Sequence, residues 1–81
     1  MNHFIHETAL IGRHVTVGEL VTIGPGATIC DNVTIGAFTN IGSDAVIGAS
    51  ATISAYVTIG DGITIGESVT VGPNQTVETN L

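Results

Sequence analysis

The chain of 81 residues has almost no positive charge: Arg13 is its only basic residue besides histidine, and its formal net charge is −6. Proteins that bind nucleic acid neutralise phosphates with clustered Lys and Arg, so we expect no nucleic-acid partner. An anionic membrane surface needs the same basic residues. No apolar stretch is long enough for a transmembrane helix, so we expect no membrane partner either.

Cysteine and aromatic residues are also scarce. Cys30 is the only cysteine, so no disulfide can form within the chain. No basic start followed by an apolar run resembles a signal peptide, and we therefore expect a cytoplasmic protein. Aromatic residues make up 4% of the chain, whereas hydrophobic residues make up 43% and Gly occurs 11 times. This composition favours thin repetitive layers over a globular core.

What the sequence does contain is an uninterrupted repeat of six residues. Every sixth position from 5 to 77 is Ile or Val, and Gly follows it in nine of the twelve complete repeats. From Ala9 onward, a second small or apolar residue lies two positions before each Ile or Val, except at Gln75, and the residue between them is Thr in nine repeats. Inward residues two apart predict one short strand per repeat, with the Thr facing outward.

The residues after each Ile or Val must turn the chain. We expect the Gly column to adopt positive φ, because Gly does so without a Cβ penalty. The next position takes Pro25 and Pro73, the only two prolines. Proline lacks an N–H, so its restriction to corners leaves the strand ladder intact. Each strand is then expected to pair with its counterpart in the next coil.

The number of strands per coil follows from the outward residues, which we place at the first position of each strand. They form three columns with a spacing of eighteen: bulky Leu20, Phe38 and Tyr56; polar His14, Asn32, Ser50 and Ser68; and mixed Thr8, Gly26, Asp44 and Gly62. Three columns predict an all-β parallel helix with three short strands per 18-residue coil, about four and a half coils and no inserted loops. We expect one domain over 1–81, with 1–4 as an N-terminal cap, 5–76 as twelve full hexads and 77–81 as a partial repeat.

The hexads resemble those of the bacterial hexapeptide-repeat family, whose pattern is an aliphatic residue, Gly, two variable residues, a small residue and a variable one. "IGRHVT", "IGPGAT", "ICDNVT" and "IGDGIT" fit this pattern, and "FIHETALIG" looks like the opening of many such domains. The resemblance covers residues 4–81. It implies a left-handed coil, whereas most parallel crossovers are right-handed.

The resemblance also carries expectations about function. Family members are commonly homotrimers, and many are acyltransferases that depend on acyl-CoA or an acyl carrier and use a histidine as base. Others are γ-class carbonic anhydrases, translation-factor subunits or structural subunits. The resemblance therefore implies a homotrimer, with acetyl-CoA or another acyl-CoA as a co-substrate and a small-molecule acyl acceptor if the chain is an enzyme. No permanently bound cofactor is expected.

The candidate catalytic residues are His14, Asp31 and Asn32. Eighteen-residue spacing places Arg13 beside Asp31 and His14 beside Asn32. A histidine oriented by a polar neighbour can act as a general base on a hydroxyl or amine that attacks a thioester. The alternative is a solvated surface histidine and an ordinary cross-coil pair of Arg13 and Asp31.

Other reactive residue types predict no further site. His3 and His6 do not match the three convergent histidines of a γ-carbonic anhydrase, so we predict no metal site. Cys30 and Ser54 replace Gly in its column and are expected to be small corner residues.

Exposed apolar residues suggest a different role for the surface. Leu20, Phe38 and Tyr56 are expected at one edge of a face, where they would form the contact between identical subunits. A non-catalytic structural or assembly module that uses this column therefore stays open beside the acyltransferase. Ice binding is a remote third option, because one face carries a regular array of hydroxyl groups from Thr16, Thr34, Thr52 and Thr70.

Overall fold

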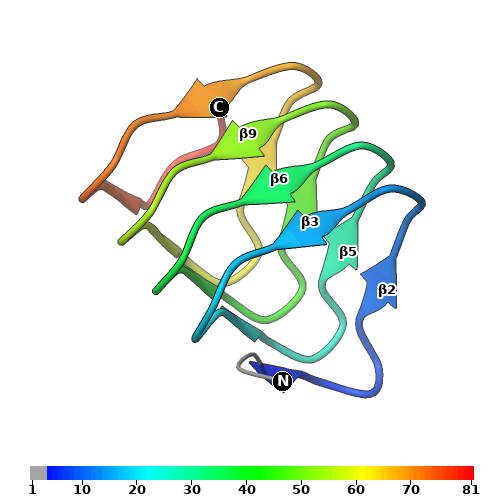
Figure 1. Ribbon diagram of the computed structural model, residues 1–81. Coiled ribbons are helices and arrows are strands. Elements are labelled where there is room, and N and C mark those ends of the chain that lie inside the picture. The colour runs from blue at the N-terminus through cyan, green and yellow to red at the C-terminus, as the bar shows by residue number, and fades with distance from the viewer. Residues whose placement is uncertain (1–3) are drawn as a thin grey trace.

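The computed structural model describes residues 4–81, which form an all-β coil (Figure 1). Thirteen strands of two residues each occur in this part of the chain, and each contains the Ile or Val of its repeat. Residues 4–81 contain no helix that could span a membrane. The predicted all-β class is confirmed.

The strands lie in three parallel sheets, which form the three sides of the coil. Sheet A contains β1 (Phe4–Ile5), β4 (Thr22–Ile23), β7 (Asn40–Ile41), β10 (Thr58–Ile59) and β13 (Thr76–Val77). Sheet B contains β2 (Leu10–Ile11), β5 (Thr28–Ile29), β8 (Val46–Ile47) and β11 (Thr64–Ile65). Sheet C contains β3 (Thr16–Val17), β6 (Thr34–Ile35), β9 (Thr52–Ile53) and β12 (Thr70–Val71).

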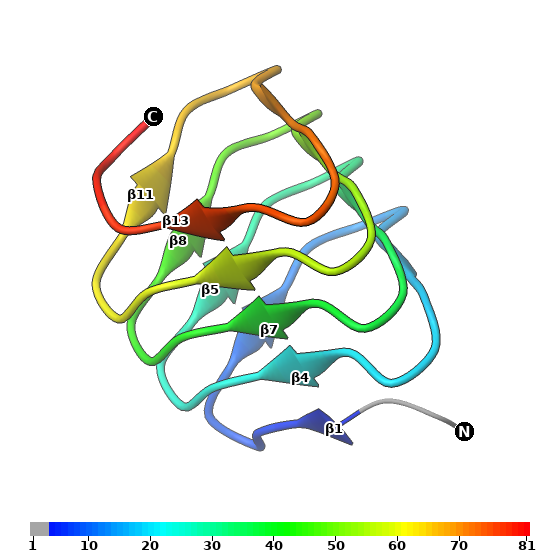
Figure 2. The ribbon, with the colours of Figure 1, turned by 90° about the vertical axis from the view of Figure 1, so that its left-hand side faces the viewer.

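The register of the sheets confirms the coil of eighteen residues. Ile5 pairs with Ile23, and Thr16 pairs with Thr34, each one coil later. Seen with β1 below β13, the chain runs from right to left along sheet A and then passes behind while it rises (Figure 2). This path is a left-handed coil of about four turns, as the resemblance implied.

The core is a stack of inward Ile, Val and Ala side chains. The Ile column is almost completely buried from Ile23 to Ile65. Thr39 is the one buried polar side chain among residues 4–81. Its column neighbours Val21 and Val57 have the same branched shape, and its Oγ1 donates a hydrogen bond of 3.0 Å to the carbonyl of Ser54. Burial of this hydroxyl is therefore compensated.

The expected positive φ of the Gly column was wrong. From Gly12 to Gly48, glycine is favoured in this column because successive coils approach closely. A Cβ on Gly48 would lie 2.7 Å from the Glu67 nitrogen, and one on Gly36 would lie 2.6 Å from the Ala55 nitrogen. These distances are shorter than real carbon contacts allow, so the backbone of the coil above leaves no room for a side chain at these two positions.

Positive φ occurs two residues after the Gly column, at the position assigned above to the start of each strand. This position is a corner and not a strand residue, which corrects the placement of the three columns. A left-handed conformation costs an L-residue about 1–2 kcal/mol, and Asn, Asp and Gly tolerate it best. The left-handed residues are His14, Leu20, Gly26, Asn32, Phe38, Asp44, Ser50, Tyr56, Gly62, Ser68 and Asn74.

The two ends of the coil differ. At the C-terminal end the Asn80 Oδ1 accepts the N–H of Thr64 at 2.8 Å. Leu81 donates its N–H to the Thr64 carbonyl at 2.9 Å and accepts the N–H of Gly66 at 2.8 Å. Residues 78–81, the C-terminal tail, therefore cover the last edge of sheet B. At the other end Phe4 belongs to β1, and the rest of the expected cap, residues 1–3, lies outside the described residues.

Candidate functional site

The predicted catalytic residues lie on one corner, between sheets B and C. Asp31 Oδ1 accepts the backbone N–H of Arg13 at 2.8 Å, and the Asn32 N–H donates to the Arg13 carbonyl at 2.8 Å. These bonds fix the second coil directly on the first. His14 and Asn32 both have exposed side chains and left-handed backbones, with φ of 57° and 63°. The corner thus carries an imidazole, an amide and a carboxylate from two adjacent coils.

The carboxylate of Asp31 has a partner that the sequence did not indicate. The hydrogen bond comes from the backbone N–H of Arg13, whereas the spacing suggested a contact with the Arg13 side chain. Asp61 makes the same contact at another corner, because its Oδ1 accepts the Ser43 N–H at 2.9 Å. The repetition shows that an Asp at this position ties two coils together.

His6 forms a second polar cluster at the corner between sheets A and B. Its Nδ1 lies 2.9 Å from Thr8 Oγ1 and accepts the Thr8 N–H at 3.2 Å. Thr8 Oγ1 in turn accepts the Gly26 N–H at 3.0 Å. Because Nδ1 is an acceptor, the neutral ring carries its proton on Nε2. His6 therefore closes the corner of the first coil through a short hydrogen-bonded chain.

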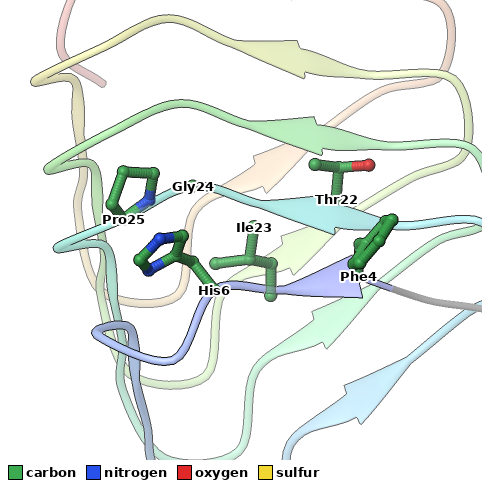
Figure 3. Close-up of a pocket in the computed structure, with 6 residues that line it drawn as sticks. All are labelled: Phe4, His6, Thr22, Ile23, Gly24 and Pro25. Carbon is green, nitrogen blue, oxygen red and sulfur yellow. The ribbon is translucent and has the colours of Figure 1, made fainter.

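A small pocket lies beside His6 on the outer side of sheet A (Figure 3). Its volume is about 190 Å³, below the 300–1,000 Å³ of typical small-molecule sites. Sequence reasoning missed it, although the eighteen-residue spacing placed Phe4 below Thr22 and His6 below Gly24. The lining residues are Phe4, His6, Thr22, Ile23, Gly24 and Pro25.

Leu20, Phe38 and Tyr56 form the aromatic column, which follows the corner between sheets C and A. The rings of Phe38 and Tyr56 are stacked, with centroids 5.0 Å apart and planes 5° from parallel. All three side chains remain largely exposed. The column is therefore an exposed apolar strip over three successive coils, and Phe4 adds another exposed ring on the adjoining sheet A.

The remaining candidates form no cluster. Among residues 4–81 no group of three or more His, Cys, Asp or Glu side chains is placed to hold a metal ion. Cys30 is a free, half-buried cysteine in the Gly column.

A left-handed coil of six-residue repeats with exposed polar corners places the protein in the class of hexapeptide β-helices. The family model described as Bacterial transferase hexapeptide (six repeats) matches residues 8–43 and 38–77, and the chain belongs to this family.

Solved structures agree with this family. A histidine-to-asparagine mutant of perosamine N-acetyltransferase from Caulobacter crescentus, in complex with CoA and GDP-perosamine, is similar with a TM-score of 0.82 and 15% identity, over 99% of this chain and 47% of that one. Serine acetyltransferase isoform 3 from Entamoeba histolytica, in complex with cysteine, gives a TM-score of 0.65 and 28% identity, over 91% of this chain and 34% of that one. The chain thus spans about half or a third of these enzymes. No curated protein matches the sequence significantly.

Proposed function

We propose that this chain is the β-helix of an acyl-CoA-dependent acyltransferase that acts as a homotrimer. The observation that carries the proposal is the match of residues 8–77 to a transferase family. The coil shared with an acetyltransferase that binds CoA supports it.

The aromatic column supplies the contact for the proposed trimer. Its exposed, stacked rings are apolar surface that association would remove from water. If this corner of the triangular coil points to a threefold axis, sheet A of one subunit faces sheet C of the next. His14 lies at the far edge of sheet C, so it would border the groove between two subunits.

The proposed chemistry uses His14 as a general base. Its imidazole takes the proton of an acceptor hydroxyl or amine while the acceptor attacks the thioester carbonyl carbon of acyl-CoA. The tetrahedral intermediate then breaks its C–S bond. The acyl group stays on the acceptor, and the CoA thiolate recovers the proton from the imidazolium. Asn32, one coil above, is placed to orient the ring or the acceptor.

Calorimetric titration with acetyl-CoA tests this proposal first. We expect saturable binding at millimolar ligand or below, and release of CoA thiol when an amino-sugar nucleotide or serine is the acceptor, the acceptor types of the two solved relatives. His14→Asn keeps a residue type suited to the left-handed corner but removes the base. It should retain binding and lose thiol release, while His6→Asn keeps both. Absence of binding at millimolar acetyl-CoA would rule out the enzyme.

A non-catalytic assembly module is the second candidate, and one contact favours it. Asp31 ties Arg13 to the next coil in the same way as Asp61 ties Ser43, so the proposed site contains an ordinary structural link. A trimer that binds no acetyl-CoA would support this candidate.

A further inference from the structure

The first coil has features that the other coils lack. At the outward strand positions Thr predominates, but the first coil has Phe4 and Leu10, which are 79% and 67% exposed. The inward side chain of Ile11 is 39% exposed, whereas its counterpart Ile29 one coil later is 1% exposed. The N-terminal end of the coil, formed by residues 4–20, therefore presents several exposed apolar side chains on adjoining sheets.

Within residues 4–81, backbone groups at this end have no strand partner of the kind found in later coils. The carbonyls of Ile29 and Ile35 accept N–H groups from the coil below. The carbonyls of Ile11 and Val17 occupy the same positions in the first coil, and within residues 4–81 no strand lies beyond β1, β2 or β3. Three open edges on an apolar surface form a template for strand pairing.

Charge is distributed unevenly along the coil. The first coil holds Arg13, the only Lys or Arg of the sequence, together with Glu7 and Glu19 at its other two corners. Every charged residue beyond it is acidic: Asp31, Asp44, Asp61, Glu67 and Glu78. Contact between two C-terminal ends would bring like charges together, whereas the N-terminal end can complement its own copy.

We propose that the N-terminal ends of two copies stack on each other about a twofold axis. The axis passes through the aromatic-column corner and the middle of sheet B. With this axis, β2 lies antiparallel to the partner's β2. The corner that carries Arg13 then lies over the partner's corner that carries Glu7. The contact repeats itself by symmetry, so it closes at two copies. It buries Leu10 against its counterpart and pairs Arg13 with glutamate on both sides. At the third corner, through which the axis passes, it brings Glu19 near the partner's Glu19, so two attractive pairs are set against one repulsive pair.

Stacking of an N-terminal end on a C-terminal end fits the structure less well. Placing β2 of the next copy on β11 is blocked, because Leu81 already bonds Thr64 and Gly66 there. Sheet A has one strand more than sheet B, so the same placement would also put β1 of the next copy where β13 lies. The inward side chain of Val77 near that end is 6% exposed, and Leu81 is 52% exposed there, whereas Phe4, Leu10 and Ile11 are all exposed at the N-terminal end.

The twofold contact is independent of the proposed trimer and compatible with it. An axis through the aromatic-column corner also crosses a threefold axis at that corner, so two trimers can join end to end. The full assembly would then have a mass of about 49 kDa, six times the 8.2 kDa chain. A chain that does not form trimers would stop at about 16 kDa.

The contact is tested by exchanging the charges of Arg13 and Glu7 and measuring the mass in solution by light scattering and sedimentation. Arg13→Glu and Glu7→Arg each place like charges at the junction, and each should raise the end-to-end dissociation constant about tenfold or more. The double variant should return it close to the wild-type value. Glu67→Arg, in the column of Arg13 but in the last coil, is the matched control and should change nothing. Glutamate at residue 67 shows that this corner position accommodates Arg13→Glu without loss of fold.

The dependence of the mass on protein concentration decides whether the N-terminal ends associate. A wild-type protein whose mass never doubles over the micromolar to millimolar range would overturn the proposal. So would a double variant that associates no better than the single ones, or open-ended growth of the mass, which signals stacking of N-terminal on C-terminal ends. Failure of the trimer is distinguishable, because it leaves a 16 kDa species where failure of the end contact leaves one of about 25 kDa.

Discussion

At the residue scale, two neighbouring corner positions select their residues for different physical reasons. Gly48 is glycine because the backbone of Glu67 occupies the space of its Cβ. Ser50, two residues later, has a φ of 62° and nevertheless carries a side chain. The position of Gly48 is limited by space, and the position of Ser50 is limited by backbone conformation. The same substitution therefore changes the free energy of unfolding by different amounts at the two positions.

Replacement of Gly48 by Ala is predicted to destabilise the protein by about 1–3 kcal/mol, the range for overpacked sites. Its added methyl would lie 2.7 Å from backbone atoms of the next coil. Gly60 belongs to the same column, but a Cβ there would meet its nearest atom, the Val77 carbonyl oxygen, at 3.4 Å. Gly60→Ala is the matched control and should be close to neutral. Urea denaturation measures both, and equal losses of stability would contradict the close-approach explanation.

At the scale of elements, the strands are too short to be stable alone and the corners carry the variation. Each strand has two residues and pairs only with strands one coil away. A two-residue strand offers few hydrogen bonds, so its stability depends on the column above and below it. The acidic residues and the stacked rings of Phe38 and Tyr56 therefore lie outside the strands, where they do not disturb this pairing.

Phe38→Asp is predicted to reduce the solution mass by a factor of three if the aromatic column forms the trimer. A carboxylate on the ridge would have to be desolvated on association. Asp44 already occupies the equivalent left-handed position in another column, with φ of 59°, so the fold should tolerate this residue. Thr64→Asp on the outer side of sheet B should keep the wild-type mass. Light scattering gives both values, and an unchanged Phe38→Asp mass would rule out this contact.

The sequence predicted the elements better than their chemistry. Spacings of six and eighteen give the strands, the three sheets and the pairs such as Ile5 with Ile23, because each depends on a repeated apolar column. The position of positive φ was missed, because Leu20 and Phe38 do not look like turn residues. The bond from the Arg13 N–H to Asp31 was missed as well, because spacing brings residues together without showing which atoms bond.

At the scale of the whole molecule, stability is a sum over neighbouring coils. Each coil contacts only the coils directly above and below it, as the strand order shows. A repeat protein of this type has no long-range contact that a missing internal unit would remove.

Removal of residues 24–41, one complete coil, is therefore predicted to leave a folded β-helix. The junction joins Ile23 to Gly42 and keeps every column in phase. The denaturant m-value should fall by about a quarter, because it scales with the surface exposed on unfolding. Removal of residues 24–32 shifts the inward columns by half a repeat and should abolish folding. Circular dichroism and urea titration measure both, and a shorter deletion that folds equally well would contradict the column model.

The position of the two ends gives the protein an unusual mechanical property. β1 and the C-terminal tail lie at opposite ends of the stack, so tension between them runs along its axis (Figure 2). Such tension loads one strand pair after another and detaches the coils in succession. Each coil occupies about 4.8 Å of the axis but releases about 60 Å of extended chain. Under load the molecule would behave as an extensible tether that lengthens in uniform steps.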